Sequence, residues 1–406
     1  MRIGMIGPFA LYPKGTVSVR ILSMAKALKK RGHHVAVFLP PYDNRAHSGK
    51  HLRIDGIDLY NVKVLKIESP IDYLIVSARL TVKALMYKPD VIHVFKPKGY
   101  SGLAAMLLIF LRKIRLIGTP IVVDSDDWEG IQGFGAFYRE HAIYSGIAVK
   151  FFDFQERWIT RRVDALTVAS RTLERQMNLF GVPKRKVFYI PNGPHASTSK
   201  TASFDLKLIR DKFEIDNNPL ILLYTRFFEF RIEKVIELLL RVRQKLHEAK
   251  LLVVGKGMYN EETHFLEQVK NNYLTDSVIY VGWAKPEELP GYLAVADVAI
   301  YPYDDTILNR AKCPGKLVEL MGEGKAVVAE SVGQIHEYIK DNESGILVPP
   351  NNIEMFAEKI IEVLRNKTLR KKLEGGAKQR IWSQFNWDTM VNTIEKAYGL
   401  AGKNKQ

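Results

Sequence analysis

Residues 313–329 read CPGKLVELMGEGKAVVA and predict a helix, a tight turn and a strand, which together form one repeat of a parallel α/β sheet. Pro314 suits the first helical turn, where no backbone N–H donor is needed, and Gly324 suits the position just past the helix end. The free N–H groups at such a helix start attract phosphate. Glu319 lies about one and a half turns further along, where its carboxylate could accept hydrogen bonds from ribose hydroxyls. The alternative interpretation is a solvated helix residue.

The same alternation of strand and helix runs through both halves of the chain. The strands predicted in the first half are residues 2–8, 34–39, 91–95, 121–124, 165–169 and 187–190. Those predicted in the second half are residues 221–224, 251–254, 278–281, 298–301, 326–329 and 345–348. Helical periodicity lies between them, as at residues 17–31. The pattern predicts two doubly wound parallel sheets, joined by a polar linker region from 195 to about 218.

The composition agrees with two domains in a reducing compartment. The chain has 406 residues, more than one hydrophobic core usually serves. Its one cysteine, Cys313, excludes an intrachain disulfide and zinc-finger spacing, and favours the cytoplasm. The first residues pass directly into a predicted strand, so we expect no signal peptide. The longest apolar run, residues 103–111, is shorter than the roughly 20 residues that cross a bilayer.

The net charge of +16 suits an anionic partner. We favour the inner face of the cell membrane, with phosphate ligands second, and we expect no nucleic acid because its usual binding motifs are absent. The alternative is a solvated lysine-rich surface. The membrane candidates are basic residues beside apolar or aromatic runs: Arg112, Lys113, Arg115, Arg161 and Arg162. For the helix at residues 103–117, a buried crossover helix remains the alternative.

Several passages of the second half, in order and spacing, resemble glycosyltransferase family 4. They are the strand ending at Arg226, LVVGKG at 252–257, VIYVGWAKPEELPGYLAVADVAIYPY at 278–303, the helix with Glu319, and GILVPPNN at 345–352. In the first half DVIHVF, PIVVD and IPNG carry a weaker likeness. The resemblance implies an α/β GT-B fold, in which two doubly wound Rossmann-like domains face a central cleft. It implies an acceptor-binding domain at 1–200, a nucleotide-sugar-binding domain at 216–385, and a final helix at 386–402 that crosses back to the first domain.

The resemblance also implies which residues bind the donor. Arg226 stands at the family's Arg position for the donor diphosphate, and Arg231 stands where the family has Lys; both keep the positive charge. The remaining donor residues are expected to be Gly15, Thr16, Gly255, Lys316, Leu317 and Glu319. Family members commonly carry a second Glu eight residues before Glu319, where this chain has Ala311. For Lys316, a salt bridge to a glutamate of its own helix is the alternative.

On the acceptor side, the family usually has a His after the fifth strand, and Asp126 occupies that position. We expect Asp126 to be catalytic by orienting or deprotonating an acceptor hydroxyl, and its alternative role is a helix N-cap. Arg226 and Arg231 are expected to be catalytic by stabilising charge that grows on the leaving diphosphate. His93, Asp124 and Asp127 are the other acceptor-side candidates, although His93 could be a satisfied strand-end histidine. The acidic residues also suit Mg²⁺ or Mn²⁺. We expect no metal and no cofactor besides the donor, because metal-dependent DxD chemistry belongs to another transferase fold.

The expected function is that of a retaining, metal-independent glycosyltransferase. It would move a sugar from a nucleotide-diphosphate sugar to an acceptor hydroxyl, on a glycan or a lipid-linked acceptor. The protein would work in the cytoplasm or peripherally on the inner face of the membrane. Two alternatives remain: a nucleotide-sugar 2-epimerase of the same architecture, and a non-catalytic sugar-nucleotide or membrane-binding protein, which Ala311 favours.

Overall fold

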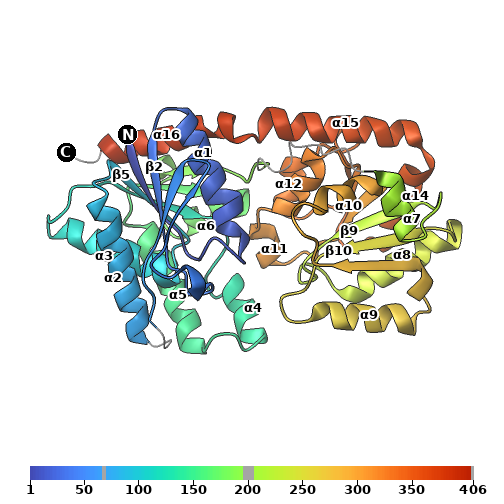
Figure 1. Ribbon diagram of the computed structural model, residues 1–406, viewed down its shortest axis with the longest axis horizontal. Coiled ribbons are helices and arrows are strands. Elements are labelled where there is room, and N and C mark those ends of the chain that lie inside the picture. The colour runs from blue at the N-terminus through green and yellow to red at the C-terminus, as the bar shows by residue number, and fades with distance from the viewer. Residues whose placement is uncertain (66–69, 195–204, 404–406) are drawn as a thin grey trace. The chain divides into compact units, whose positions relative to one another are not determined.

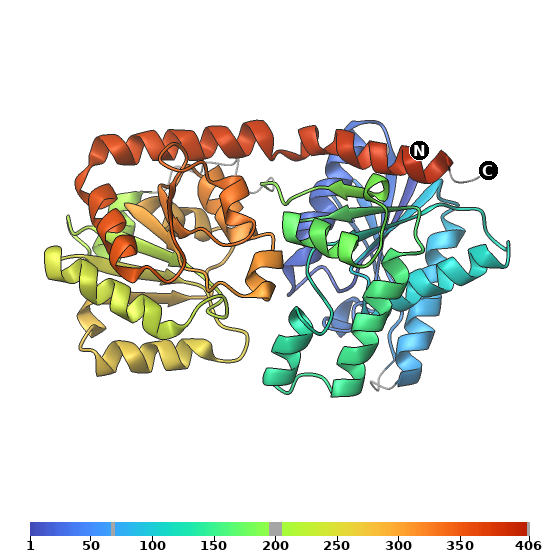
Figure 2. The same ribbon diagram turned by 180° about the vertical axis from the view of Figure 1, so that it is seen from behind.

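The computed structural model describes residues 1–65, 70–194 and 205–403 (Figure 1, Figure 2). The chain divides into two compact units. Unit 1 comprises Met1–Gly193, Ala311–Cys313 and Trp387–Gln406, and unit 2 comprises Pro194–Arg310 and Pro314–Asn386. Of the predicted linker, residues 195–204 lie outside the described residues, and α7 (Leu206–Lys212) occupies part of the remainder.

Unit 1 is built on an eight-stranded sheet in the order β3-β4-β2-β1-β5-β6-β7-β8. Its strands are β1 (Arg2–Ile6), β2 (His34–Leu39), β3 (His51–Ile54), β4 (Ile57–Asn61), β5 (Val91–Phe95), β6 (Ile121–Ser125), β7 (Ala165–Val168) and β8 (Val187–Tyr189). Its helices include α1 (Leu22–Lys30), α2 (Pro70–Met86), α3 (Gly99–Lys113), α4 (Phe134–Glu140), α5 (Gly146–Thr160), α6 (Arg171–Leu179) and α16 (Trp387–Lys403). The six predicted strands are confirmed. The helix predicted at 17–31 is also present, but its first part is a π-helix, η1 (Thr16–Ile21).

The hairpin β3–β4 was missed, and it forms the antiparallel edge of this otherwise parallel sheet. Its strands are only partly buried and carry charged residues, so no continuous apolar run marks them. The turn residues Asp55 and Gly56 both have positive φ, 51° and 73°. An Asp-Gly pair between alternating residues was therefore the available signal.

Unit 2 is built on a six-stranded parallel sheet in the order β11-β10-β9-β12-β13-β14. Its strands are β9 (Leu220–Tyr224), β10 (Lys250–Val254), β11 (Val278–Gly282), β12 (Val298–Tyr301), β13 (Val327–Glu330) and β14 (Ile346–Val348). Its helices include α7, α8 (Ile232–Lys245), α9 (Glu261–Asn271), α10 (Leu289–Val295), α11 (Ile307–Ala311), α12 (Gly315–Gly322), α13 (Ile335–Tyr338), α14 (Ile353–Arg365) and α15 (Lys367–Gln384). Helices cover both faces of each sheet (Figure 1, Figure 2). The expected α/β fold with two doubly wound sheets is confirmed.

Each sheet reverses its direction of winding once. In unit 1 the reversal lies between β1 and β5, and in unit 2 it lies between β9 and β12. At such a point the loops from neighbouring strands leave towards opposite faces, which opens a crevice at the carboxyl ends of the strands. Both crevices are therefore places where a ligand would bind.

The final helix α16 belongs to unit 1 and completes its core. Its inward residues join the same apolar cluster as α1 and the central strands: Trp387, Met390, Val391, Ile394, Ala397, Tyr398 and Ala401. The aromatic and aliphatic residues recur at helical spacing, so one face of α16 is buried. The predicted return of the last helix to the first domain is confirmed. Within the described ranges, every helix lacks either the length or the apolar character needed to cross a membrane.

Candidate functional site

The crevice of unit 2 holds a pocket at the carboxyl ends of β9 and β12. Its lining residues are Leu223, Tyr224, Thr225, Glu229, Phe230, Ile300, Tyr301, Pro302, Tyr303 and Lys316. Tyr301 and Tyr303 stack with their ring centroids 5.2 Å apart and form an aromatic wall. The lining residues include one cationic side chain, Lys316, and one carboxylate, Glu229.

Among the described residues, Lys316 and Arg226 of unit 2 have no opposite charge in direct contact. Lys316 lies in the first turn of α12, and its Nζ sits 3.4 Å from the centroid of the Tyr224 ring. Arg226 follows β9 by two residues and is half-buried. Within the described part of the chain, neither side chain makes a hydrogen bond or an ion pair. Burial lowers the pKa of Lys316 to about 8, and the opposing effect of Glu319 is smaller. The two cations and the N-terminus of α12 together form a place for an anion.

Glu319 lies one turn further along α12. Burial, the charge of Glu319 and a hydrogen bond to its carboxylate raise the pKa of Tyr224 well above the ordinary value, so the Tyr224 hydroxyl remains a donor. Leu317 is fully buried, which leaves only its backbone for a ligand. The structure thus brings Lys316, Glu319 and the end of β9 together.

The backbone conformation beside this pocket requires a glycine at position 255. Its φ is +130°, and an added Cβ would lie 1.9 Å from the carbonyl oxygen of Thr225. Its N–H donates to the carbonyl of Gly282 at 2.7 Å. Because Thr225 precedes Arg226, the glycine lets the β10 loop pass close to the end of β9.

Arg231 differs from Arg226 in its surroundings. Its side chain is 68% exposed, whereas Arg226 is half-buried, and neither arginine lines the pocket. The backbone N–H of Arg231 donates to an Asp304 carboxylate oxygen at 2.9 Å. Arg231 therefore starts α8 at a fixed point, and its largely exposed guanidinium lies 4.0 Å from the same Asp304 carboxylate.

A buried ion triad beneath the pocket was not predicted. Lys234 Nζ lies 3.0 and 2.9 Å from the two carboxylate oxygens of Glu330 and 2.6 Å from Asp304. Glu330 also accepts hydrogen bonds from the backbone N–H groups of Tyr303 and Asn351, both at 2.7 Å. The triad ties together the loops that follow β9, β12 and β14. The available signal was an acidic residue, Glu330, at the end of an apolar strand run.

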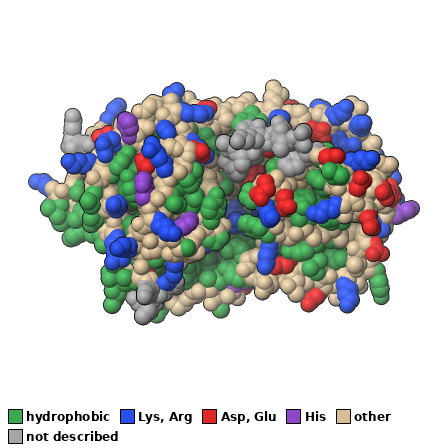
Figure 3. Space-filling model, viewed as in Figure 1, with side chains coloured by type: hydrophobic (Ala, Val, Ile, Leu, Met, Phe, Trp, Pro, Cys, Tyr) green, Lys and Arg blue, Asp and Glu red, His purple; other side chains and the backbone are tan. Residues whose placement is uncertain are grey.

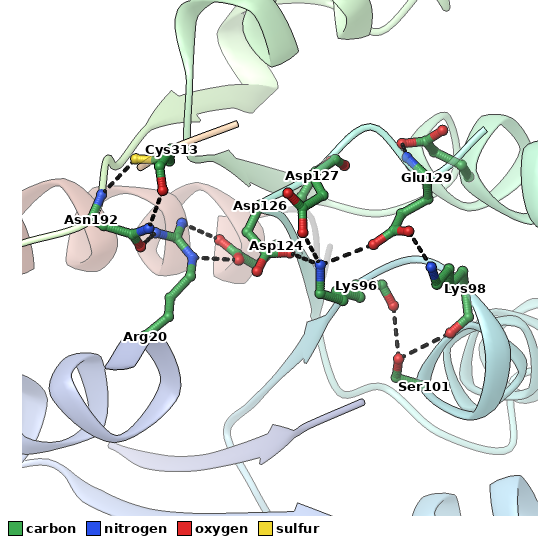
Figure 4. A network of polar contacts seen from close by, with 12 residues as sticks. Arg20, Lys96, Lys98, Ser101, Asp124, Asp126, Asp127, Glu129, Asn192 and Cys313 are labelled. Carbon is green, nitrogen blue, oxygen red and sulfur yellow. Dashed lines mark hydrogen bonds and ion pairs between the residues drawn. The ribbon is translucent and has the colours of Figure 1, made fainter. Parts of the chain in front are cut away.

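The crevice of unit 1 holds a denser set of charges, shown in Figure 4. Arg20 is 2% exposed, and its guanidinium donates to both carboxylate oxygens of Asp124 at 2.7 Å. It also donates to Asn192 at 3.0 Å and to the Ile190 carbonyl at 2.9 Å. Thr167 donates to Asp124 as well. This bidentate pair is buried, and both of its side chains bind further protein groups.

Lys96 lies at the end of β5, among three carboxylates (Figure 4). Its Nζ is 2.9 Å from Asp126, 2.5 Å from Asp127 and 2.9 Å from Glu129. The carboxylate oxygens of these three acids lie within 4.8 Å of one another, a spacing that could hold a metal ion. The ammonium of Lys96 supplies the positive charge there. Lys98 continues the network by donating to Glu129 and to the Tyr138 hydroxyl.

The carboxylates of this cluster differ in their pKa values. Burial would raise the pKa of Glu129, but Lys96 and Lys98 lower it to about 2. Burial raises the pKa of Asp126 to about 6, and Lys96 only partly opposes that effect. Asp126 is consequently ionised at neutral pH and still basic enough to accept a proton.

Two acceptor-side candidates lie deeper than predicted. His93 and Asp124 are both fully buried. The His93 ring contacts the Tyr398 hydroxyl at 2.9 Å and Thr167 at 3.2 Å, and burial lowers the pKa of His93 to about 4. His93 and Asp124 are therefore not expected to touch an acceptor directly, because both are buried and their polar atoms already bind protein groups. The interpretation of His93 as a satisfied strand-end histidine agrees with these contacts.

The remaining candidates of unit 1 lie nearer its surface. Gly15 caps η1 and Thr16 begins it, and both are half-buried. Asp126 and Asp127 are 12% and 22% exposed, so they are the acidic residues of the cluster that a ligand could reach. The partners missed from the sequence were Arg20, Lys96, Lys98 and Glu129. The run KPKG directly after a buried strand was the available signal for the two lysines.

Comparisons with known proteins agree with this architecture. Residues 15–193 match the family described as glycosyl transferase 4-like domain, and residues 205–380 match glycosyl transferases group 1. An uncharacterized glycosyltransferase of Methanocaldococcus jannaschii is 24% identical over 401 residues, which are 95% of each chain. The phosphatidyl-myo-inositol mannosyltransferase of Mycolicibacterium smegmatis is 25% identical over 98% of this chain and 93% of its own.

Solved structures share the fold over nearly the whole length. The sucrose-phosphate synthase of Thermosynechococcus elongatus has a TM-score of 0.71 at 20% identity, covering 98% of both chains. Anabaena HepE, in complex with UDP and glucose, has a TM-score of 0.70 at 17% identity, covering 97% of this chain and 98% of its own. The two family matches together take in most of both units, and the chain therefore belongs to glycosyltransferase family 4, with the GT-B fold.

Proposed function

We propose that this glycosyltransferase moves a sugar from a nucleotide-diphosphate sugar to an acceptor hydroxyl, with retention at the anomeric carbon and without a metal ion. The observation that carries the proposal is the pair Arg226 and Lys316, two cations at the crevice of unit 2 without an ion pair among the described residues. Both side chains are half-buried, and removing a cation from water costs free energy unless an opposite charge compensates it. A diphosphate would compensate both.

On this proposal unit 2 binds the donor. The diphosphate is held by Arg226, Lys316 and the N-terminus of α12, and the Glu319 carboxylate accepts hydrogen bonds from the ribose hydroxyls. As the bond to the sugar breaks, negative charge grows on the diphosphate, and the preorganised cations stabilise it. The nucleotides bound by relatives of known structure, such as UDP in HepE, support this assignment.

Unit 1 would bind the acceptor. Asp126 is the group proposed to take the proton of the acceptor hydroxyl, since its carboxylate is reachable and its pKa is about 6. Lys96 holds Asp126 and Asp127 in place and balances their charge. Asp124 and His93 act from the interior by fixing Arg20 and the neighbouring strands.

A ligand screen tests the proposal. UDP, GDP and ADP, each alone and as sugar conjugates, are added to the protein during thermal unfolding. A ligand at one hundred times its Kd stabilises the folded state by about 2.7 kcal/mol, so one base should raise Tm clearly. Arg226→Ala and Lys316→Met should abolish the shift, whereas the exposed control Arg241→Ala should keep it. If no nucleotide or nucleotide sugar shifts wild-type Tm, the proposed function is wrong.

Turnover then separates the alternatives. A glycosyltransferase releases nucleoside diphosphate only with an acceptor, and NMR of the product reports whether the anomeric configuration is retained. Conversion of the donor to its 2-epimer without acceptor would favour the epimerase instead. Tight binding with no turnover towards any acceptor would favour the non-catalytic protein.

We further propose that the acceptor is lipid-linked and that unit 1 binds an anionic membrane surface. Large apolar side chains are exposed on α2, α3 and α5, helices that pack in the order α2, α3, α5: Ile71, Leu74, Val82, Met86, Phe110, Ile147, Phe151 and Phe154. Hydrophobic and basic side chains are interspersed over unit 1 in Figure 3. Lys113 and Arg115 are exposed at the end of α3 and remain candidates for contact with lipid headgroups. Arg112 forms an ion pair with Asp164 instead, so we no longer propose it as a lipid contact. The phosphatidyl-myo-inositol mannosyltransferase relative supports a lipid acceptor.

Liposome flotation tests this second proposal. Binding to vesicles with phosphatidylserine should be strong at low salt and fade as the Debye length falls below about 10 Å. The double variant Lys113→Gln/Arg115→Gln should float less, and Lys207→Gln on the exposed face of unit 2 serves as the matched control. Equal recovery with anionic and neutral vesicles at low salt would rule the membrane surface out.

A further inference from the structure

We propose that Glu229 binds hydroxyl groups of the donor sugar and makes unit 2 selective for a neutral hexose over a hexuronic acid. The inference rests on the proposed function, because it assigns the sugar end of the same donor. The position of Glu229 in the pocket, its rigid backbone and the charges around it carry the inference.

Glu229 is the acidic side chain among the pocket-lining residues. It is half-buried, and the pocket walls beside it are Tyr301, Tyr303 and Lys316. A carboxylate accepts hydrogen bonds and donates none, so its natural ligands in a pocket are hydroxyl or amine donors. The free space inside the pocket is about 10 Å³, enough for one water molecule, so a sugar ring would lie across its mouth, where the half-buried Glu229 can be reached.

The backbone of Glu229 is held from two sides. Its carbonyl oxygen accepts hydrogen bonds from the Asp304 N–H at 2.9 Å and from the Asn309 side-chain amide at 2.6 Å. Asp304 in turn contacts the buried Lys234 at 2.6 Å, and Lys234 is locked to Glu330. The ion triad is therefore a positioning device. It fixes the loop that carries Glu229 before any ligand arrives, which lowers the entropy cost of binding.

The charges explain why the sugar should be neutral. Family members commonly have a second glutamate eight residues before Glu319, but this chain has the fully buried Ala311, which offers no carboxylate. Glu229 supplies one from a different loop. Lys316 faces the diphosphate in the proposed donor pose, so it is already compensated. A hexuronate carboxylate would then meet Glu229, and like charges in a partly buried pocket repel.

The test compares three ligands on Glu229→Gln by isothermal titration calorimetry. The probes are UDP, UDP-glucose and UDP-glucuronate, or GDP, GDP-mannose and GDP-mannuronate if the screen selects guanosine. The affinity for the neutral sugar nucleotide should fall by about tenfold or more, as expected for a lost charged hydrogen bond, while the affinity for the nucleoside diphosphate alone stays unchanged. The preference for hexose over hexuronate should narrow by a similar factor.

The matched control is Glu233→Gln, which removes an exposed carboxylate from the first turn of α8. It should leave all three affinities unchanged. If Glu229→Gln does not fold, Glu229→Asp keeps the charge but shortens the reach, and it should show the same selective loss. Equal loss for the diphosphate and the sugar nucleotide, or no loss for either, would overturn the role of Glu229 and leave the proposed function intact. Failure of wild type to bind any of the probes would instead count against the proposed function itself.

Discussion

The cations in the two crevices of this protein differ in whether they have carboxylate partners. In unit 1 Lys96 is surrounded by three carboxylates within 2.9 Å, and Arg20 forms a bidentate pair with Asp124. In unit 2 neither Arg226 nor Lys316 has a hydrogen bond or an ion pair with any described residue. The two crevices occupy equivalent positions in their sheets, so topology alone does not explain the contrast.

The difference indicates what each crevice is built to receive. A cation that is already neutralised by protein contributes structure and tunes its neighbours, whereas a cation left without a partner is available to an anion. Unit 1 therefore offers a polar site with little net attraction for phosphate, which suits a hydroxyl-bearing acceptor. Unit 2 offers an attractive site for a diphosphate.

Breaking the buried ion pair of Arg20 and Asp124 in unit 1 should have the largest effect, which is on stability. Arg20→Met leaves Asp124 buried without its counter-charge, and the free energy of unfolding should fall by about 3–5 kcal/mol. Urea denaturation followed by circular dichroism measures the loss. The control is Lys30→Met, whose partner Asp388 is 63% exposed, and its cost should stay below about 1 kcal/mol. Similar small costs for both variants would show that the Arg20 pair is not structural.

Removing an open cation of unit 2 should act on catalysis rather than on folding. Arg226→Ala should lower kcat by about a hundredfold or more, because it removes charge that stabilises the leaving diphosphate. Its urea midpoint should not change. Arg231→Ala should lower kcat less, since that side chain is 68% exposed. Steady-state kinetics on both variants decides the order, and a larger effect of Arg231 would move the diphosphate away from the pocket.

Changing the ribose contact should weaken binding and leave the fold intact. Glu319→Gln should cost roughly 1–3 kcal/mol of nucleotide affinity, the value of a charged hydrogen bond. Titration calorimetry with the nucleoside diphosphate is the measurement, and Glu323→Gln at the end of the same helix is the control. Equal affinities of wild type and Glu319→Gln would place Glu319 outside the site.

The pH profile should report one group from each crevice. Asp126 has a pKa of about 6 and must be ionised to act as a base, so kcat/KM should fall as the pH drops below about 6. Lys316 has a pKa of about 8 and must be charged to attract the donor, so kcat/KM should also fall above about pH 8. Lys316→Arg should shift the upper limb to higher pH. A flat profile between pH 5 and 9 would contradict both assignments.

Chelation of metal ions should have the smallest effect, because we expect it to leave the reaction rate unchanged. The ammonium of Lys96 lies where a metal ion bound by Asp126, Asp127 and Glu129 would be, and it balances their charge. Initial rates with and without EDTA should agree. Loss of activity on chelation, restored by Mn²⁺, would show that a metal takes part and that Lys96 moves aside.

Much of the fold was predictable because local sequence patterns encode the strands and helices. Apolar strand runs and helical periodicity predicted every strand of unit 2 and six of unit 1, and the order of the elements predicted parallel sheets. The start of α12 was also predictable, since Pro314 is its N-cap and Lys316 and Glu319 both lie in the helix. The β3–β4 hairpin escaped because its strands are short and half-exposed.

The sequence by itself determined two doubly wound domains, the helix that carries Lys316 and Glu319, and the family. The tertiary structure alone decided which charges are compensated. Lys96 meets Glu129 33 residues later, Arg20 meets Asp124 across 104 residues, and Lys234 meets Glu330 across 96. Such pairs depend on which strand ends lie side by side in the sheet, and local periodicity does not encode that order. The same order leaves Arg226 and Lys316 without a hydrogen bond or an ion pair among the described residues and places Glu229 beside Lys316 in the pocket.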